Sequence, residues 1–356
     1  MKSMKRIIIL FFLVWGTVSV QAQEAVKPYR VTEYIQWYPA IKQAEMRDKW
    51  LEDYEYGEWQ FTGMVTAKDR TVVTPQADVN YGYSWFNISN EPVVITMPDY
   101  DKYYSLSIFD MNHYMEVRVK PDKPVVVRLP HQKSPIKDAH EVVLQTYQGL
   151  AFTRQVIVNN AEEVMGLAKK ITITGGNGDY PFIIPDFTKE EAAAGLAEIK
   201  TAAASLEGGT KLFGSVYEGV GNLDRALGVF YGQLGTQARY ANYQLYATDA
   251  NGQPLSGNKS YEITIPSSGM IKNENGYWSI TVYNAADKYL IPNQKEVYNA
   301  SSYSSSTNAD GSVTVRINPE GNGANAIPTE SQNWYCVLRV YEPTDNIQFP
   351  DMTTLK

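Results

Sequence analysis

Five short runs rich in β-branched and aromatic residues follow one another between residues 93 and 158, and prolines, aspartates and asparagines separate them. Runs of this composition and length favour strands over helices. They cover residues 93–97, 103–109, 125–129, 142–147 and 152–158. Their close spacing and punctuation predict an antiparallel β-sandwich over residues 66–158.

β-rich runs return after residue 240. Asn251-Gly252 is a strong tight-turn signal, so we expect a hairpin between strands at residues 243–248 and 261–265. Residues 334–341 form a strand in which even-numbered and odd-numbered side chains lie on opposite faces. These patterns predict a second antiparallel sandwich, of jelly-roll type.

Helical patterns precede and separate the two β-rich regions. Residues 31–56 carry apolar side chains on one side, and Pro39 makes either two short helices or one kinked helix possible. Further along, the Asn160 side chain is expected to cap a helix, and Thr188 opens a capping box with Glu191. A third helix is expected from Leu223.

The predicted fold class is therefore mainly β with a helical insert: an N-terminal antiparallel β-sandwich, central helices and a C-terminal jelly-roll-like β-sandwich. The expected segments are a signal peptide at 1–22, a helical segment at 23–65, the first sandwich at 66–158, helices at 159–239 and the second sandwich at 240–356.

The first residues have the pattern of an export signal. Lys2, Lys5 and Arg6 precede an apolar run over residues 7–14, and the small residue Ala22 offers a cleavage position. The apolar run is shorter than the roughly 20 residues that span a bilayer. We therefore expect cleavage after Ala22, a periplasmic or secreted protein, and no membrane span once the signal is removed.

The charge and the cysteine content restrict the partners and the chemistry. Removing the three basic signal residues from the 32 in the chain leaves 29 against 39 acidic residues, a net charge of −10. Nucleic acid is thus not an expected partner. Cys336 is the only cysteine, so no intramolecular disulfide can form. His131 and His140 lack zinc-ligand spacing, and we expect neither a metal site nor a cofactor.

Two blocks of the chain resemble known domain families. Residues 74–81 read Thr-Pro-Gln-Ala-Asp-Val-Asn-Tyr, and residues 98–111 contain Pro-Asp followed by Tyr-Tyr-Ser-Leu, which together resemble the DUF1254 domain. Residues 249–252, 277–283 and 308–312 resemble the marks of the DUF1214 domain. This resemblance implies two β domains with a helical segment and implies no activity. The chain departs from the family pattern at Gln76 and Val79-Asn80.

Asp78, Asn80, Tyr81 and Tyr83 cluster where a loop is expected to enter a strand. Asp78 is a candidate for orienting a ligand or binding a cation together with the Asn80 carbonyl oxygen. The alternative is an Asx-turn, in which the Asp78 carboxylate accepts local backbone amides.

Asp110 and His113 follow a predicted strand and form a second candidate group. His113 is a possible general base, with Asp110 holding its other ring nitrogen. The alternative is a purely structural pair, because spacing alone does not bring the two side chains together. Cys336 is expected to be a buried small side chain rather than a nucleophile.

Trp278, Tyr283 and Arg339 form a third candidate group. Ligand sites are common at domain seams, and there Tyr283 and Arg339 would meet Asp78 or Asp110. The alternative places Trp278 in the core and pairs Arg339 with an internal acid.

The expected function is an exported binding protein whose ligand, a small polar molecule or carbohydrate, lies at the seam between the two β domains. One alternative is a hydrolase or lyase that uses aspartate, histidine and tyrosine at the same seam. The other alternative is a structural or assembly protein, and a homo-oligomer is compatible with all three.

Overall fold

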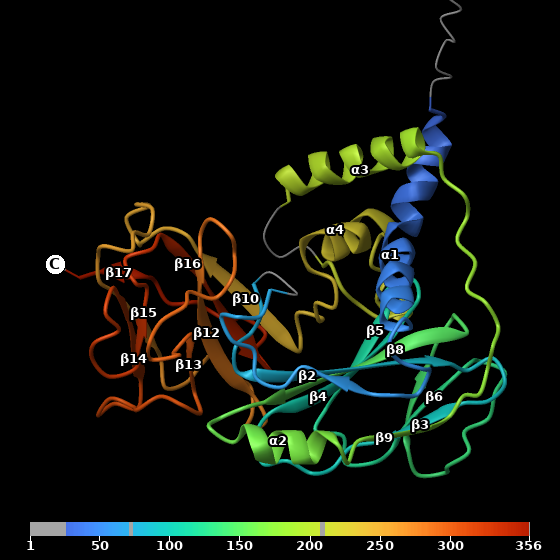
Figure 1. Ribbon diagram of the computed structural model, residues 1–356, viewed down its shortest axis with the longest axis horizontal. Coiled ribbons are helices and arrows are strands. Elements are labelled where there is room, and N and C mark those ends of the chain that lie inside the picture. The colour runs from blue at the N-terminus through green and yellow to red at the C-terminus, as the bar shows by residue number, and fades with distance from the viewer. Residues whose placement is uncertain (1–25, 71–73, 207–210, 356) are drawn as a thin grey trace, which may run out of the picture.

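The computed structural model describes residues 26–70, 74–206 and 211–355. Within these ranges the chain forms 17 strands in four sheets and four α-helices. The prediction of a mainly β protein with helices between two β-rich regions is confirmed (Figure 1). The expected signal peptide at residues 1–22 lies outside the described residues.

The larger sheet of the N-terminal region is antiparallel and has the strand order β1-β2-β8-β4-β5. Its strands are β1 (Gln60–Phe61), β2 (Val79–Asn87), β4 (Tyr104–Asp110), β5 (Met115–Val119) and β8 (Gln148–Val156). Every residue of β4 and β8 is buried, because the sheet is covered on both faces.

The smaller sheet of this region packs on one face of the larger one, with the order β7-β6-β3-β9. Its strands are β3 (Val93–Thr96), β6 (Val125–Arg128), β7 (His140–Val143) and β9 (Thr172–Gly175). The edge pair of β6 and β7 is parallel, whereas an antiparallel sandwich was expected. Strand β9 comes from the segment in which only helices were expected.

The C-terminal region contains two four-stranded sheets packed around one apolar core. The first has the order β10-β16-β12-β13, made of β10 (Ala241–Tyr246), β16 (Trp334–Tyr341), β12 (Tyr277–Asn284) and β13 (Asn299–Ser301). The second has the order β15-β14-β11-β17, made of β15 (Ala326–Pro328), β14 (Val313–Asn318), β11 (Tyr261–Ile265) and β17 (Thr353–Thr354). Within it, β14 and β15 are parallel.

The hairpin expected at Asn251-Gly252 is present only next to the turn, where Thr248 and Pro254 form an isolated antiparallel bridge. A turn is present, with the Gly252 amide donating to the Asp249 carbonyl oxygen at 2.9 Å and Gly252 at a φ of 76°. The flanking strands β10 and β11, however, belong to different sheets. The chain crosses from one layer of the sandwich to the other here, because both layers share the same core.

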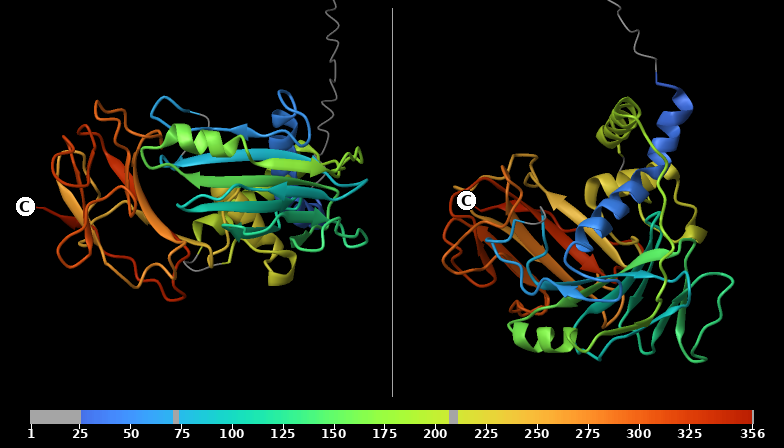
Figure 2. Two further views of the ribbon diagram at one scale, coloured as in Figure 1. Left: turned by 90° about the horizontal axis from the view of Figure 1, so that it is seen from below. Right: turned by 45° about the vertical axis from the view of Figure 1, so that its right-hand side comes forward.

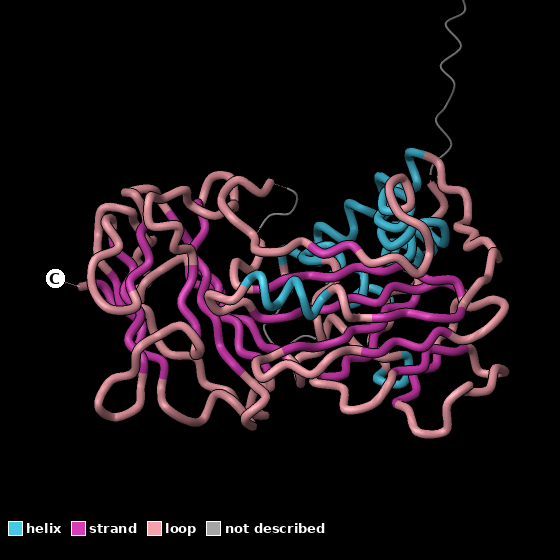
Figure 3. The backbone as a smooth tube through the Cα atoms, turned by 60° about the horizontal axis from the view of Figure 1, so that its bottom comes forward, coloured by secondary structure: helices cyan, strands magenta, loops and turns pink. Residues whose placement is uncertain are grey.

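Three helices gather over the free face of the larger N-terminal sheet (Figures 1 and 3). They are α1 (Pro28–Trp50), α3 (Lys189–Ala204) and α4 (Asn222–Gly232), and they contact one another through a shared apolar cluster. Helix α1 is a single helix with the buried Pro39 inside it, which decides between the two predicted possibilities. The capping box at Thr188 is present at the start of α3.

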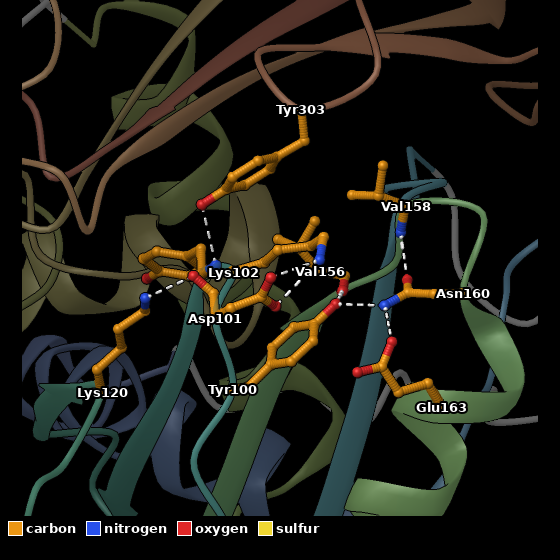
Figure 4. Close-up of polar contacts among 10 residues, drawn as sticks. Tyr100, Asp101, Lys102, Lys120, Val156, Val158, Asn160, Glu163 and Tyr303 are labelled. Atoms are coloured by element: carbon orange, nitrogen blue, oxygen red, sulfur yellow. Dashed lines mark hydrogen bonds and ion pairs between the residues drawn. The ribbon is translucent and has the colours of Figure 1, made fainter.

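Helix α2 (Ala161–Ala168) lies away from the other helices, on the opposite side of the sheet (Figure 2). The Asn160 side chain does not cap it, contrary to expectation. Its Oδ1 accepts the Val158 amide at 2.7 Å, and its Nδ2 donates to the Tyr100 hydroxyl at 3.0 Å (Figure 4). Tyr100 in turn donates to the Val156 carbonyl oxygen at 2.7 Å. Asn160 therefore ties α2 to the end of β8.

Candidate functional site

Residues 74–78 lie against the face of β12 and β16 that points away from the C-terminal core. The Gln76 amide donates to the Tyr277 hydroxyl at 2.6 Å, and its carbonyl oxygen accepts the Tyr341 hydroxyl at 2.6 Å. The Tyr283 hydroxyl donates to the Pro75 carbonyl oxygen at 2.7 Å. The two sequence blocks that carry the family resemblance are thus in direct contact, although 201 positions separate Gln76 from Tyr277.

Asp78 ends this segment with a buried carboxylate, and neither of its oxygens has a hydrogen-bond partner among the described residues. Burial raises the pKa of Asp78, whereas the neighbouring Ser279 hydroxyl, Gln76 side chain and Arg339 charge act in the lowering direction. The Asx-turn considered from the sequence is absent, because no backbone amide bonds to the carboxylate. Asp78 is therefore a buried carboxylate that lies beside Ser279, Gln76 and Arg339 but makes no well-formed hydrogen bond to the described residues.

Arg339 of β16 lies opposite Ser279 of β12, beside Asp78. Its Nη2 donates to the Thr74 carbonyl oxygen at 3.1 Å, and its guanidinium carbon lies 5.8 Å from the centroid of the Tyr283 ring. Its Nη1, like the Ser279 hydroxyl, is buried without a partner in the described part of the chain. Arg339 therefore lies beside Asp78, as expected, but the two side chains form no direct ion pair.

A second arginine faces the seam from the N-terminal sheet. Arg154 of β8 lies in one cross-strand row with Tyr81 of β2 and Ser105 of β4. Its Nη2 donates to the Leu234 carbonyl oxygen at 2.6 Å. Burial raises the pKa of the Tyr81 hydroxyl, while Arg154 and Arg339 both lower it. The Tyr81 hydroxyl thus interacts electrostatically with one arginine from each of the two β regions.

Tyrosine rings close the inner end of this seam. Tyr103 of the N-terminal region lies 5.1 Å from Tyr277 and 4.8 Å from Tyr341, measured between ring centroids. Tyr303 reaches across from the C-terminal region, and its hydroxyl accepts the Tyr103 amide at 3.1 Å (Figure 4). Tyr243 lies next to Arg339 in the sheet and is 43% exposed, so the seam reaches solvent there.

Sequence reasoning missed several residues of this seam: Gln76 as a contact, Arg154, Tyr103, Tyr243, Ser279 and Tyr341. Arg154 had an available signal, because it is the single charged residue in the run at 152–158 and a buried arginine requires partners. The sequence gives no such signal for the tyrosines. Strand alternation predicts on which face of a sheet a side chain lies, but it does not predict which part of the protein packs against that face.

Asn80 and Trp278 do not face the seam. Asn80 accepts the Gly63 amide at 2.9 Å and donates to Gln155 at 3.2 Å, on the opposite face of β2 from Tyr81. Trp278 lies in the apolar core of the C-terminal sandwich. Alternation along a strand explains both positions, since neighbouring residues point to opposite faces.

Asp110 and His113 are close in sequence, but their side chains do not pair. The Asp110 Oδ1 accepts the Tyr114 amide at 2.9 Å, and the His113 Nε2 accepts the Leu234 amide at 3.2 Å. Burial lowers the pKa of His113 to about 3 and raises the pKa of Asp110 to about 7. His113 is thus a neutral, buried side chain whose accepting nitrogen is occupied.

Neither Cys336 nor the metal-ligating residue types form a further candidate site in the described part of the chain. Cys336 is fully buried in the C-terminal core, and burial raises the pKa of its thiol. Among residues 26–70, 74–206 and 211–355, no group of three or more His, Cys, Asp or Glu is arranged to hold a metal ion. None of the helices described there is both long enough and apolar enough to cross a membrane.

Two solved structures share this fold. A crystal structure of a Vibrio parahaemolyticus protein is 17% identical, with a TM-score of 0.75 over 92% of this chain and 99% of that chain. A crystal structure of an uncharacterized Burkholderia cenocepacia protein is 13% identical, with a TM-score of 0.53 over 94% of this chain and 92% of that chain. At these identities the likeness concerns the fold alone.

Two family models match the chain, and both are described as proteins of unknown function. DUF1254 matches residues 59–175 and DUF1214 matches residues 240–345. No curated protein matches the chain. The two models follow each other in the order expected from the sequence and together span more than half of the residues. The chain therefore belongs to the family of proteins that carry a DUF1254 domain followed by a DUF1214 domain.

Proposed function

We propose that this protein binds a small polar molecule at the seam between its two β regions. The observation that carries the proposal is a set of buried groups that make no well-formed hydrogen bond to the described residues: both Asp78 oxygens, the Arg339 Nη1 and the Ser279 hydroxyl. Buried polar groups are nearly always hydrogen-bonded, to protein or to something else. A bound polar molecule between Asp78 and Arg339 would supply the missing partners.

The chemistry of these groups restricts the ligand. The Arg339 Nη1 is a donor and suits a carboxylate or carbonyl oxygen. The Asp78 carboxylate is an acceptor and suits a hydroxyl or amine of the same molecule. Hydroxy acids, amino acids and sugars carry both kinds of group. Entry would pass Tyr243, because it is the most exposed residue of the cross-strand row that contains Arg339.

The hydrolase or lyase alternative has less support. It relies on Asp110 orienting His113 as a base, but the two side chains bond to different backbone amides. A base also requires an accessible lone pair near its substrate. The His113 Nε2 already accepts a hydrogen bond, and the ring is fully buried.

Export remains part of the proposal. The basic start, the short apolar run and the small residue Ala22 support it. Mass spectrometry of the protein recovered from its native cell tests it, since cleavage would give a mature chain that begins at Gln23. Recovery of the intact chain from the cytoplasm would overturn export and leave the seam proposal standing.

A thermal-shift screen with L-malate, L-serine and D-glucose tests binding at the seam. A ligand at ten times its Kd adds about 1.4 kcal/mol of stability, which raises the Tm by a few degrees. The shift should disappear in Arg339→Lys, because lysine keeps the charge but its single nitrogen cannot replace the two-pronged guanidinium that donates to Thr74 and to the ligand at once. Arg316→Lys on β14 is the matched control. No shift with any of the three compounds, or the same shift in Arg339→Lys, would contradict the proposal.

A further inference from the structure

Two neighbouring hollows lie in the N-terminal region, and none of the residues that line them belongs to the seam. The first is lined by residues of β4, β5, β7 and the short 3₁₀ helix Val216–Glu218, with Asp110 among them. The second is lined by residues 145–147 and 180–183. Gln145 lines both, so the hollows adjoin one another.

Two exposed tyrosines dominate the second hollow. Tyr147 is 40% exposed and Tyr180 is 52% exposed, and their ring centroids lie 4.6 Å apart. The segment that carries Tyr180 runs along the outside of the N-terminal region between β9 and α3 (Figure 1). Large exposed aromatic side chains that gather in one place are a common mark of a binding surface.

Hydrogen bonds from neighbouring side chains fix the backbone that carries the aromatic pair. The Tyr180 carbonyl oxygen accepts the side-chain amides of Asn87 and Gln148, each at 2.9 Å. On the other side, the Thr146 hydroxyl accepts the Met111 amide at 3.0 Å and donates to the Gln148 carbonyl oxygen at 2.7 Å. A preformed aromatic surface binds with little loss of conformational entropy.

The first hollow adds a buried polar group. Asp110 is 1% exposed and uses its Oδ1 to accept the Tyr114 amide. The Asn112 backbone amide also lies near this carboxylate and, like the Tyr114 amide, acts on its pKa in the lowering direction. Burial raises the pKa of Asp110 to about 7, so near neutral pH much of this carboxyl is protonated and can both donate and accept.

The hollow is also nearly free of net charge. Its other acidic residue, Glu116, pairs with Arg118 at 3.0 Å. An organic cation would need unpaired negative charge here, and an anion would need positive charge. A neutral molecule with apolar faces and many hydroxyls needs neither. It can lay a face on Tyr147 and Tyr180 and bond a hydroxyl to Gln145. The first hollow, of about 20 Å³, has room for one water, through which such a molecule would reach Asp110.

We propose that these adjoining hollows form a second binding site, for a neutral oligosaccharide, with Tyr147 and Tyr180 as its aromatic surface and Asp110 as its inner hydrogen-bonding group, reached through a water. The site shares no residue with the seam between the two β regions. It therefore stands or fails independently of the small-molecule site proposed there.

Isothermal titration with cellotriose, maltotriose and triacetylchitotriose tests this site. At least one of these trisaccharides should bind, and Tyr180→Ala should weaken its binding by about tenfold or more through the lost aromatic contact. Tyr180→Ala should still fold, because the bonds that hold this segment go to its backbone carbonyl. Tyr29→Ala, which removes a 62% exposed tyrosine from α1, is the matched control and should bind normally.

Three results would overturn the proposal. One is the absence of binding by all three trisaccharides at about 10 mM, the weak end of specific recognition. Another is equal binding by the wild type and by Tyr180→Ala. The third is a preference for choline, which would show that the aromatic pair serves a cation. Loss of binding in Arg339→Lys with retention in Tyr180→Ala would assign the sugar to the seam instead.

Discussion

At the scale of single residues, this protein buries ionisable side chains at positions where burial of their charge destabilises the folded state. Asp78 and Arg339 are buried beside each other without a direct ion pair, and Asp110 is buried against the Tyr114 amide. A buried carboxylate that lacks compensating charge destabilises the folded state. Such residues are retained most often where they serve a site, and both proposed sites contain one of them.

The raised pKa of Asp110 predicts a pH-dependent stability. From about pH 4 to about pH 7 the folded chain keeps a proton that the unfolded chain has released, so the unfolding free energy falls as pH rises. The slope approaches 1.4 kcal/mol per pH unit for one such group, a rough upper figure. Asp110→Asn should remove this contribution while keeping an acceptor for the Tyr114 amide.

Urea denaturation at pH 5 and pH 7 measures this effect. The wild type should lose more stability than Asp110→Asn between the two values, and the exposed Asp179→Asn variant should behave as the wild type does. Equal losses in all three proteins would mean that Asp110 is ionised throughout this range.

At the scale of elements, close helix packing depends on one small residue. Gly195 of α3 lies against the Tyr34 ring of α1, and a methyl group added there would overlap the ring. Gly166 of α2 also lies within a helix, but a methyl group added there would meet nothing within 4 Å. Substituting alanine for Gly166 therefore tests helix propensity alone, whereas the same substitution at Gly195 also tests the packing of α3 against α1.

Alanine at these two positions should have opposite effects. Gly166→Ala should stabilise the protein by roughly 0.5–1 kcal/mol, because alanine loses less backbone entropy in a helix. Gly195→Ala should destabilise it by about 1–3 kcal/mol, because the added methyl forces α1 and α3 apart. Urea denaturation of both variants measures the difference. A stabilised Gly195→Ala variant would show that α3 can move without loss.

At the scale of the whole molecule, Gln76 joins the two β regions. Its side chain bonds two buried hydroxyls, those of Tyr277 and Tyr341, in a seam that is otherwise packed with aromatic rings. A leucine of similar volume would leave both hydroxyls without these partners. Each unsatisfied buried hydroxyl costs about 1–3 kcal/mol.

Gln76→Leu should therefore loosen the contact between the two β regions more than it unfolds either one. Hydrogen exchange should rise first in residues 74–78 and along the adjoining faces of β12 and β16, because these amides lie at the seam. Gln253→Leu, at an exposed glutamine, is the control. Equal exchange in the two variants would mean that ring packing alone holds the regions together.

The sequence by itself determined the local features of this protein. Short β-rich runs predicted a mainly β chain with central helices, Thr188 predicted a capping box, and the mid-strand position of Cys336 predicted its burial. Two motif blocks predicted the family. Each of these follows from residues a few positions apart, where periodicity, capping and turn preference act.

Only the tertiary structure decided which residues meet. It placed Gln76 between Tyr277 and Tyr341, separated Asp110 from His113, and assigned β10 and β11 to different sheets. The physical reason is that strand alternation fixes the face on which a side chain lies but not the surface packed against that face. Contacts between residues some 200 positions apart depend on how whole sheets pack, and no local pattern encodes that choice.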